Sequence, residues 1–465
     1  MPTAVTRPAT QASNQSFKGV RVLEFAGDCS GIAAAYAGWQ LAGMGARVVE
    51  FGPVSELDSN DKRQEPSPIA LARDVLRHGK LRSPYSKGED ELVALLSECD
   101  ILLCDAPAEL ERIAGPLASL NHAYPHLIIG VATTFGLDGP YAKYRGCALD
   151  AQAISSVSWV LGEPGRAPLA LPPGTTEHQS GAMLAAGCLL ALLVREQGLG
   201  GRIVDIALAD VLASYVAGNC RFFVHHGLTW ERSGRRASGS GGAYPFTILP
   251  CKDGLVCICG RTRDEWNRFV KAMGEPEWAS QPRYQKLRTM GREYPDEVDA
   301  LVMPWLAQHT MAELEEIALE NGLIVSPLRS VSDVLETPHF TAREFLVDGT
   351  AAGQNVKVPS LPFQVLRERR ECAIDDASDL LQMRSEPTTV NYRESKAPLS
   401  GIRVLDLGWV WSAPWVSTML GELGAEVIKV EHAKRPDNLR LAGRIVRNGE
   451  FVEGPSTEMS PMFHQ

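Results

Sequence analysis

Short apolar runs alternate with helical patterns along the first part of the chain. Strand-like runs occur at Val20 to Phe25, Arg47 to Phe51, Ile101 to Cys104 and Leu127 to Ala132, and helical patterns at Ala33 to Met44 and Asp90 to Ser97. Buried parallel strands form continuous apolar runs, and helices connect them. The pattern therefore predicts an α/β fold with a doubly wound parallel (Rossmann-like) sheet.

The pattern changes beyond Ala217. The segments Tyr244 to Pro250 and Leu255 to Gly260 flank a Lys-Asp-Gly turn and predict a β-hairpin, and helical patterns follow at Asp264 to Met273, Asp296 to Ala307 and Met311 to Asn321. We expect a smaller α+β domain over residues 221–335. Residues 336–370, including Val356 to Phe363, should then return to the large domain of residues 17–220.

The longest apolar run is Ala182 to Val194, which has 13 residues. A membrane-spanning helix needs about 20 apolar residues. We therefore expect a buried helix rather than a membrane segment.

Two stretches of the chain occur twice. FKGVRVLEF (Phe17 to Phe25) is similar to LSGIRVLDL (Leu399 to Leu407), and LAGMGARVVEF (Leu41 to Phe51) is similar to LGELGAEVIKV (Leu420 to Val430). The offset is 382 residues for the first pair and 379 for the second, because the copies differ by three residues near Gly27 to Gly31. A repeat this long indicates duplicated domains. We expect a lead-in over 1–16, a linker over 371–398 and the truncated front of a second copy over 399–465.

Charge and composition exclude several classes of protein. The net charge is −10, with 45% hydrophobic and 22% charged residues. Nucleic-acid binding requires a positive surface, so we expect no nucleic-acid partner. The first residues lack a charged stretch followed by an apolar one, so we expect a cytoplasmic enzyme without a membrane partner.

Cysteine and histidine spacing gives no metal site. The ten cysteines form no CxxC pair, and the adjacent pair His225 and His226 cannot converge on one ion from a regular element. We expect reduced and mostly buried thiols. The first strand is followed by GDCSG (Gly27 to Gly31) instead of GxGxxG, which argues against a dinucleotide cofactor.

Several motifs in order resemble the family III CoA transferases. The C-terminal segment has GIRVLDL, SAPWVSTMLGELGAEVIKVEH and RPDNLR (Arg435 to Arg440), and the first copy has FGLDGPYAKYRG (Phe135 to Gly146), AGCLLALLVREQGLGGRIVDIAL (Ala186 to Leu208) and SGSGGAYPF (Ser238 to Phe246). The family includes formyl-CoA and carnitine CoA transferases and α-methylacyl-CoA racemase. The resemblance implies acyl-CoA and a small carboxylic acid as substrates, with no tightly bound cofactor.

The resemblance also implies a carboxylate nucleophile. Family members hold the acyl group on an aspartate as a mixed anhydride, which must be shielded from water. Counting back from Gly181 and Gly187, the matching position is Glu177, whose carboxylate is one methylene further out. The alternative is a helix-start glutamate favoured by the helix dipole.

The first copy departs from the family pattern at other positions. Gly146, Cys147 and Ala148 replace the family's GHD or GYD, and Asp150 is two positions away, so no acid/base pair for racemisation remains. Cys104 to Ala108 (CDAPA) replaces NFRPG, and Glu50 replaces a lysine, which lowers the positive charge expected near CoA phosphates. Lys80 remains from an NRGK turn as a candidate phosphate contact. The first copy resembles a degenerate half.

The second copy retains more of the family's residues. The candidate CoA-binding residues there are Trp411, Ser412, Lys429, His432, Arg435 and Arg440. Ligands of open α/β sheets bind at the strand ends that face helix N-termini, although such charges also occur simply as solvated surface groups. In the first copy, Gly239, Gly241 and Gly242 match a mobile family loop that covers the intermediate; the alternative is an ordinary turn.

These features predict an acyl-CoA:carboxylate CoA transferase. In this interpretation the first copy is a scaffold, the second begins the catalytic copy, and its nucleophile lies beyond Gln465. Family subunits form interlocked dimers, so we expect such a homodimer or an intramolecular pseudo-dimer. The alternatives are a non-catalytic CoA-binding pseudoenzyme or partner subunit, a racemase or lyase of the same family and, more weakly supported, an NAD-dependent oxidoreductase.

Overall fold

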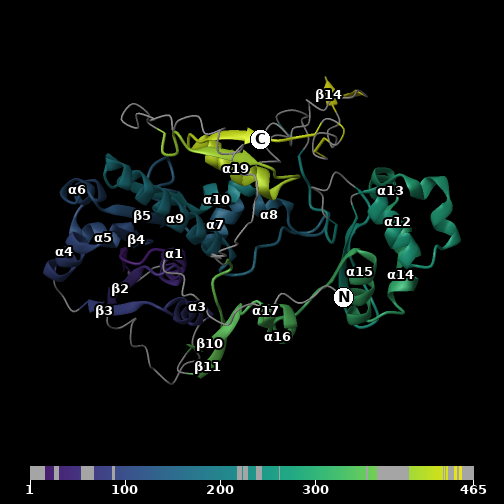
Figure 1. Ribbon diagram of the computed structural model, residues 1–465, viewed down its shortest axis with the longest axis horizontal. Coiled ribbons are helices and arrows are strands. Elements are labelled where there is room, and N and C mark those ends of the chain that lie inside the picture. The colour runs from purple at the N-terminus through teal and green to yellow at the C-terminus, as the bar shows by residue number, and fades with distance from the viewer. Residues whose placement is uncertain are drawn as a thin grey trace, which may run out of the picture.

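The computed structural model describes most of the chain in three bodies (Figure 1). The described residues are 16–25, 31–53, 68–85, 89–216, 223, 229–236, 243–260, 262–351, 354–363, 397–432, 434, 436–437, 445–447 and 450–452. A large α/β domain and a smaller α+β domain lie side by side, and a C-terminal unit of residues 397–432 forms a separate sheet.

The large domain contains a six-stranded sheet in which every neighbouring pair is parallel. Its strands are β1 (Arg21–Phe25), β2 (Arg47–Pro53), β3 (Leu81–Tyr85), β4 (Ile101–Cys104), β5 (Ile128–Thr133) and β6 (Ile203–Ala207). The strand order is β3-β2-β1-β4-β5-β6, so the chain reverses its direction of travel across the sheet between β1 and β4. This place is the topological switch point of the sheet. The predicted doubly wound parallel sheet is confirmed.

Helices connect the strands and cover both faces of the sheet (Figure 1). They are α1 (Ala33–Gly43), α3 (Pro68–Leu76), α4 (Glu89–Glu98), α5 (Pro107–Ala114), α6 (Leu117–Ala123), α7 (Ala148–Ile154), α8 (Val157–Val160), α9 (Thr175–Val194), the π-turn η1 (Arg195–Leu199) and α10 (Leu208–Tyr215). The predicted helices at 33–44 and 90–97 correspond to α1 and α4.

Two apolar cores lie on opposite faces of this sheet because successive strand side chains point to opposite sides. Val22 packs with α1 and α9 residues such as Leu41 and Leu184, whereas Leu23 packs with the α4 residues Leu92 and Leu96. Strands covered on both faces are apolar at nearly every position, which explains the continuous runs in the sequence.

The predicted helix at 182–194 belongs to α9. The segment Thr175–Leu199 is long and apolar enough to cross a membrane on length and composition alone. In the structure α9 packs against α1, β5 and β6, and Leu184 and Cys188 are buried in that contact. Only 33% of its most apolar stretch is buried, and Leu193 is 41% exposed, so the expectation of a buried helix holds for one side of α9.

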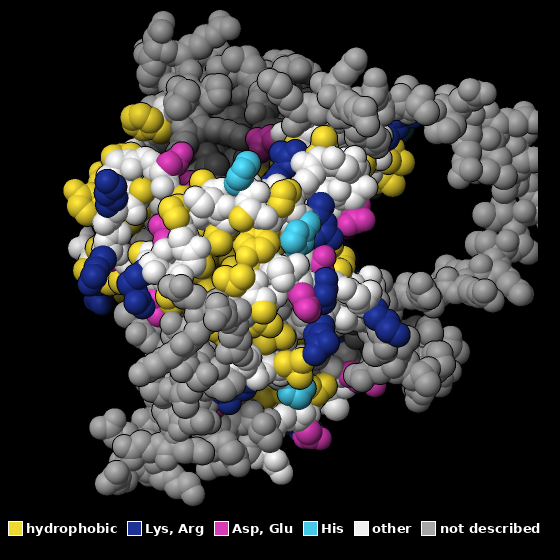
Figure 2. All heavy atoms as spheres, turned by 90° about the vertical axis from the view of Figure 1, so that its left-hand side faces the viewer, with side chains coloured by type: hydrophobic (Ala, Val, Ile, Leu, Met, Phe, Trp, Pro, Cys, Tyr) yellow, Lys and Arg dark blue, Asp and Glu magenta, His cyan; other side chains and the backbone are white. Residues whose placement is uncertain are grey.

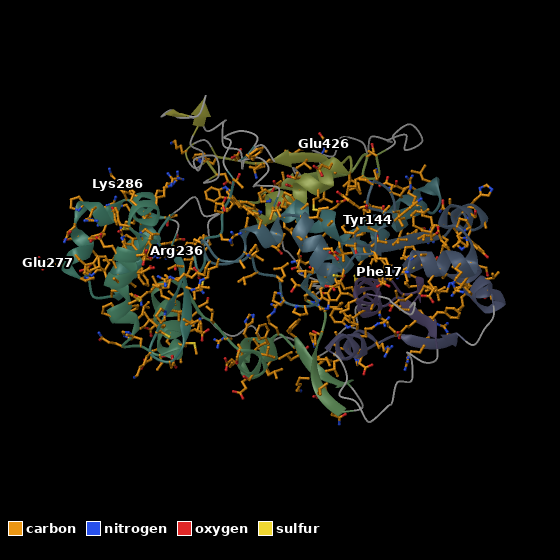
Figure 3. All side chains as sticks on the ribbon, turned by 180° about the vertical axis from the view of Figure 1, so that it is seen from behind. Phe17, Tyr144, Arg236, Glu277, Lys286 and Glu426 are labelled. Atoms are coloured by element: carbon orange, nitrogen blue, oxygen red, sulfur yellow. The ribbon has the colours of Figure 1, made fainter. Side chains whose placement is uncertain are left out.

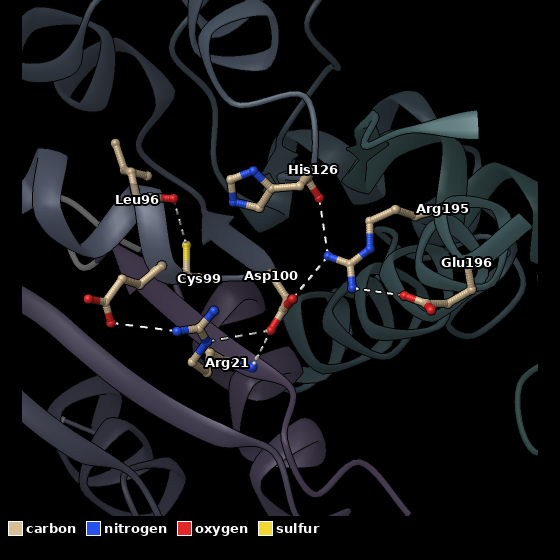
Figure 4. Close-up of polar contacts among 8 residues, drawn as sticks. Arg21, Leu96, Cys99, Asp100, His126, Arg195 and Glu196 are labelled. Atoms are coloured by element: carbon tan, nitrogen blue, oxygen red, sulfur yellow. Dashed lines mark hydrogen bonds and ion pairs between the residues drawn. The ribbon is translucent and has the colours of Figure 1, made fainter. Parts of the chain in front are cut away.

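A polar network closes the amino-terminal edge of the sheet (Figure 4). Asp100, just before β4, accepts hydrogen bonds from the Arg21 backbone N–H at 2.8 Å and from the Arg195 guanidinium at 3.0 Å. Arg195 also donates to the backbone carbonyl of His126 at 3.1 Å. These contacts join the starts of β1, β4 and β5 to the end of α9, so ligand access is expected at the opposite edge.

The smaller domain has a three-stranded antiparallel sheet formed by β7 (Phe246–Pro250), β8 (Leu255–Cys259) and β9 (Ile324–Pro327). Its helices are α12 (Arg263–Ala272), η3 (Glu277–Ser280), η4 (Pro282–Gln285), α13 (Leu287–Glu293), α14 (Pro295–Leu306) and α15 (Met311–Asn321). The predicted hairpin corresponds to β7 and β8, and the three predicted helices correspond to α12, α14 and α15. Trp266 is fully buried in this core and donates to the Tyr284 carbonyl at 3.1 Å.

A connecting segment follows the smaller domain. It contains α16 (Val331–Glu336), α17 (Pro338–Ala342) and a hairpin of β10 (Leu346–Ala351) and β11 (Gln354–Pro359). This hairpin is a separate two-stranded sheet and does not extend the six-stranded one. Leu361, just after it, packs with Ile32 and Trp39, so the chain does contact the large domain again there.

The C-terminal unit is a strand, a helix and a parallel strand. β12 (Arg403–Asp406) pairs with β13 (Glu426–Lys429) through α19 (Ser412–Glu422), the same order as β1, α1 and β2. Beyond it lies a short hairpin of β14 (Ile445–Arg447) and β15 (Glu450–Val452). Leu405 and Leu407 are 62% and 68% exposed, whereas the matching Leu23 and Phe25 are 1% and 2% exposed.

Charges of both signs are mixed on the face formed on the side of α4 and α6 (Figure 2). Lysine and arginine side chains lie mainly toward the two sides of this face, with acidic side chains among them and apolar side chains between the two groups.

Candidate functional site

Glu177 lies in the first turn of α9, at the carboxyl edge of the sheet. The end of α9 is fixed at the amino edge, because Arg195 contacts Asp100 there. The beginning of the helix therefore projects at the opposite edge, where β1 and β4 end and where open α/β sheets bind their ligands.

The first turn of α9 is held by a buried glutamine of α7. The Gln152 side chain donates to Thr176 Oγ1 at 3.0 Å and accepts from the Leu171 backbone N–H at 2.9 Å. Gln152 and Thr176 are both buried. This contact fixes the start of the helix and the direction of the adjoining Glu177 position.

The Glu177 carboxylate is partly shielded from water. The residue is half-buried, and its Oε2 atom is buried without a hydrogen-bond partner. The neighbouring His178 ring lies 4.7 Å from the Tyr36 ring, and burial lowers the pKa of His178. A buried carboxylate oxygen without a partner is uncommon in folded proteins and is compatible with a shielded nucleophile.

Close packing of α9 on α1 requires a glycine near this position. A Cβ atom added at Gly181 would lie 2.5 Å from the Ala33 carbonyl oxygen. Glycine thus allows the two helix starts to approach at the carboxyl edge, one turn from Glu177.

Lys80 is an internal residue of the large domain. Its side chain is 0% exposed, and its Nζ atom lies 2.6 Å from Glu24 Oε2 and 2.8 Å from the Ala35 carbonyl oxygen. Burial is the main reason that the pKa of Glu24 is raised, and Lys80 opposes that shift. A contact between Lys80 and a CoA phosphate would require the ammonium to leave this pair.

Glu50 is also neutralised within the fold. It is paired across the β1–β2 strands with Glu24, and Arg77 Nε donates to its carboxylate at 3.0 Å. The two acids of neighbouring strands are thus balanced by two different bases, Lys80 and Arg77.

The C-terminal unit has a different pair at the same place. Asp406 matches Glu24 in the sequence repeat, and its strand partner is Lys429, which matches Glu50. The Lys429 ammonium lies 3.3 Å from Asp406 Oδ2 and 3.1 Å from the Gly408 carbonyl oxygen, and the side chain remains 25% exposed. In the C-terminal unit, the base that balances the first-strand acid, Asp406, therefore comes from the adjacent strand β13.

A third position completes this difference. Ser417 donates to Asp406 Oδ2 at 2.8 Å, and the matching residue of the large domain is Gly38. A Cβ atom at Gly38 would lie 2.1 Å from Glu24 Oε2, so the longer Glu24 fills the space that a serine would need. The three matched pairs are Glu24 and Asp406, Glu50 and Lys429, and Gly38 and Ser417. In each unit the first-strand acid is balanced by a base and fits the space beside the helix, and in the C-terminal unit that base is the partly exposed Lys429.

The loop before α19 places Trp411 and Ser412. The Val410 backbone N–H donates to the buried Asp437 carboxylate at 2.9 Å, which anchors the loop beside the first turn of the helix. Trp411 is half-buried at the N-cap, and Ser412 is exposed as the first helical residue. His432 is exposed just beyond β13, and its Nδ1 accepts from the Lys434 backbone N–H at 3.2 Å.

The structure thus brings Trp411, Ser412, Lys429 and His432 to one unit, with Lys429 at the end of β13. Glu177 and Lys80 belong to the large domain. The remaining predicted residues, which are Gly239, Gly241, Gly242, Arg435 and Arg440, lie outside the described residues.

Asp150 has a structural contact. It accepts a hydrogen bond from the Cys147 backbone N–H at 2.8 Å and forms part of the capping box of α7. The bonds from Cys147 lower the pKa of Asp150. The residue near the family's GHD position therefore stabilises a helix start.

Asp105 was not identified from the sequence as a site residue. It directly follows β4, both of its carboxylate oxygens are buried without a hydrogen bond of good geometry, and burial raises its pKa to about 7. A sequence signal existed, because Asp105 lies within the CDAPA segment that replaces NFRPG. Its position beside the start of α1 depends on the tertiary fold.

We expect Asp105→Asn to stabilise the protein at alkaline pH. The folded-state pKa of Asp105 is raised from 3.8 to about 7, so wild-type stability declines as pH rises from about 4 to about 7 and is level above that range. The shift corresponds to at most about 4 kcal/mol of unfolding free energy. Urea unfolding should show a gain at pH 8 that is nearly absent at pH 4.5. An equal gain at both pH values would contradict the assigned pKa.

Neither metal nor disulfide chemistry is indicated in the described part of the chain. It contains no group of three or more His, Cys, Asp or Glu side chains that could hold a metal ion. Among the described free thiols, Cys99, Cys104 and Cys188 are buried, Cys147 is exposed, and Cys251, Cys257 and Cys259 are half-buried, so the expectation of mostly buried thiols does not hold for them.

Comparison with known proteins identifies the family. The model of CoA-transferase family III matches residues 17–374 and 399–464. The chain is 27% identical over 418 residues to a probable CoA-transferase of Mycobacterium tuberculosis, covering 86% of this chain and 52% of the relative. It is also 27% identical to the succinyl-CoA–D-citramalate CoA-transferase of Chloroflexus aurantiacus, covering 70% of this chain and 82% of the relative.

A solved structure has the same fold. A CAIB/BAIF family protein from Brucella suis superimposes with a TM-score of 0.64 at 21% identity, covering 75% of this chain and 92% of that protein. The chain spans about half the length of the M. tuberculosis relative. On the match of the family model to both segments, this chain belongs to CoA-transferase family III.

Proposed function

We propose that the chain is part of an acyl-CoA:carboxylate CoA transferase that works through an enzyme-bound mixed anhydride. In that reaction a carboxylate attacks the thioester carbonyl, the carbon–sulfur bond breaks and CoA leaves as the thiolate. The relative from C. aurantiacus is named for transfer between succinyl-CoA and a carboxylic acid. The substrates here are an acyl-CoA and a small carboxylic acid, without a tightly bound cofactor.

Within this proposal the chain contains two copies of the family domain with different roles. The strand–helix–strand order of the C-terminal unit and the separate family match to 399–464 support a second copy. The large domain is the scaffold copy, and the C-terminal unit is the front of the catalytic copy. The two copies pair as an intramolecular pseudo-dimer or through an interlocked homodimer in the cytoplasm.

The observation that carries this assignment is the difference in exposure between the two lysines, each of which pairs with an acid of the first strand of its unit: Lys80 is 0% exposed and Lys429 is 25% exposed. Lys80 is fully enclosed and paired with Glu24, and Arg77 is paired with Glu50, so both bases balance acids of the scaffold. Lys429 is partly exposed at the end of β13, near the exposed His432. Phosphate groups of CoA need accessible positive charge, which favours the C-terminal unit.

Different residues of the chain bind the CoA phosphates, surround the thioester and cover the intermediate. Lys429 and His432 bind CoA phosphates together with Arg435 and Arg440, which lie outside the described residues. Trp411 and Ser412 shape the region of the thioester, and the loop containing Gly239, Gly241 and Gly242 covers the intermediate. The Glu177 carboxylate in the scaffold copy does not accept the acyl group.

Incubation with acyl-CoA thioesters tests this division. The purified chain is mixed with a panel that includes succinyl-CoA, and adducts are located by intact mass and peptide mapping, with Glu177→Gln as the control. We expect CoA binding without an adduct on the Glu177 peptide. An adduct that is absent from Glu177→Gln would make the first copy a transferase and overturn the scaffold assignment.

CoA binding itself has a matched control in the same unit. Lys429→Ala should lower the affinity for CoA at least tenfold, because a charge-assisted hydrogen bond to a phosphate contributes about 1.5–3 kcal/mol. Titration calorimetry measures this affinity. Arg403→Ala should leave affinity unchanged, since Arg403 is exposed at the opposite end of β12 and pairs with Glu426. If the two variants behave alike, the C-terminal unit does not hold CoA in this way.

A pseudoenzyme is the second candidate, favoured by the internal pairing of Lys80 and Arg77. CoA binding without transfer in a complete protein containing both copies would support it.

A further inference from the structure

The carboxyl end of β4 carries an acid that the proposed reaction does not use. Asp105 comes directly after β4, and β4 is the neighbour of β1 at the switch point of the sheet. The chain leaving β1 leads to α1, so α1 starts beside the end of β4. In open α/β sheets this crevice is where ligands bind, with anionic groups at the helix N-terminus.

The Asp105 side chain reaches the start of α1. A Cβ atom placed on Gly31 would lie 3.4 Å from Asp105 Oδ2. The helix has no side-chain cap of its own, because its N-cap is Ile32 and its first turn contains no acidic residue. The positive end of the helix dipole thus faces a carboxylate from another element.

The carboxylate is enclosed at the start of the helix. Both oxygens are buried, and neither makes a hydrogen bond of good geometry. Burial raises the pKa of Asp105, whereas the Arg73 charge and the backbone N–H of Ala34, in the first turn of α1, oppose that shift. The acid therefore faces the first N–H groups of α1, which is the position that a bound anion would otherwise take.

We propose that Asp105 occupies the anion position at the N-terminus of α1, so that the large domain excludes phosphate groups from its own switch-point crevice. This extends the proposed function, because it gives a local reason why the first copy does not bind CoA. It does not depend on where the second copy binds CoA. The occupant that Asp105 excludes is the phosphate portion of a nucleotide-type ligand.

Inorganic pyrophosphate is the probe for this site. Titration calorimetry at pH 8, where Asp105 is largely ionised, compares the wild type with Asp105→Ala and Asp105→Asn. We expect the affinity of Asp105→Ala for pyrophosphate to be at least tenfold higher than that of the wild type. The calorimetric stoichiometry of this variant should show one additional pyrophosphate per chain. Asp105→Asn removes the charge but fills the space, so its gain should be smaller.

Two further variants separate this effect from others. Asp138→Ala removes an exposed acid and controls for net charge, and it should show no gain. The gain from Asp105→Ala should persist with Lys429→Ala present, which excludes binding at the C-terminal unit. If Asp105→Ala unfolds, Asp105→Ser takes its place in every comparison.

The outcomes are distinct from those of the proposed function. No gain in a folded Asp105→Ala or Asp105→Ser protein, or an equal gain in Asp138→Ala, overturns the inference about Asp105. CoA affinity that is unaffected by Lys429→Ala overturns the assignment of the C-terminal unit and leaves the pyrophosphate result intact.

Discussion

Lys80→Met is expected to destabilise the protein by about 3–5 kcal/mol, the usual cost of removing one partner of a buried ion pair. The variant leaves Glu24 enclosed in the sheet, next to Glu50 on the adjacent strand and without the ammonium that lies 2.6 Å away. Because methionine fills most of the volume of the lysine side chain, the loss of stability reflects the missing positive charge and not a cavity. Urea unfolding at pH 8 measures it.

The loss should be smaller at acid pH. Burial already raises the pKa of Glu24, and removing Lys80 raises it further, so lowering the pH protonates Glu24 and relieves the unpaired charge. Glu24→Gln combined with Lys80→Met should recover part of the stability at pH 8.

Arg82→Met is the matched control. Arg82 is 37% exposed and lies 3.8 Å from Glu50, so its loss should cost less than about 1 kcal/mol. Equal losses for Lys80→Met and Arg82→Met would mean that Lys80 is solvated and available to a ligand.

Asp299→Ala should have an effect of similar size on the smaller domain. Asp299 is a 1% exposed side chain of α14 that accepts hydrogen bonds from Arg235 at 2.7 Å, from Arg236 and from the Tyr244 hydroxyl at 2.9 Å. Its removal leaves a buried tyrosine hydroxyl and two guanidinium groups without their common acceptor. We expect a loss of about 3–5 kcal/mol in urea unfolding.

Asp296→Ala provides the control on the same helix. Asp296 also contacts Arg236, at 2.6 Å, but it is 84% exposed, so its loss should cost less than about 1 kcal/mol. If Asp296→Ala is as costly as Asp299→Ala, burial does not determine the strength of this cluster.

The location of Asp299 links this prediction to the proposed function. Arg235 and Arg236 precede the glycine-rich segment and Tyr244 follows it, so one carboxylate fixes the chain on both sides. Arg236 lies on the side of the smaller domain that faces the large domain, whereas Glu277 lies on the far side (Figure 3).

The central strands of the fold could be predicted from the sequence because their apolar runs reflect burial on both faces. β1, β2, β4 and β5 were predicted in this way. β3 and β6 were missed: both are edge strands, β3 contains Pro84, and β6 alternates exposed and half-buried positions. Edge strands are covered less completely, so their sequences lack the continuous apolar signal.

The third strand of the smaller domain was missed for a related reason. β9 is four residues long, ends at Pro327 and pairs with β8, which lies more than sixty residues earlier. Local patterns give no information about such a distant partner. The hairpin of β7 and β8 was predictable because its turn chemistry is local.

The sequence by itself determined the parallel α/β class, the smaller α+β domain, the repeated opening motif and the resemblance to CoA-transferase family III, because each depends on local periodicity or on residue order. Only the tertiary structure decided how charges are used. It showed that Lys80 is enclosed with Glu24, that Glu50 is balanced by Arg77, and that Asp105 meets the start of α1. Pairing and burial join residues distant in sequence, and they fix whether a charged side chain stabilises the fold or remains accessible to a ligand.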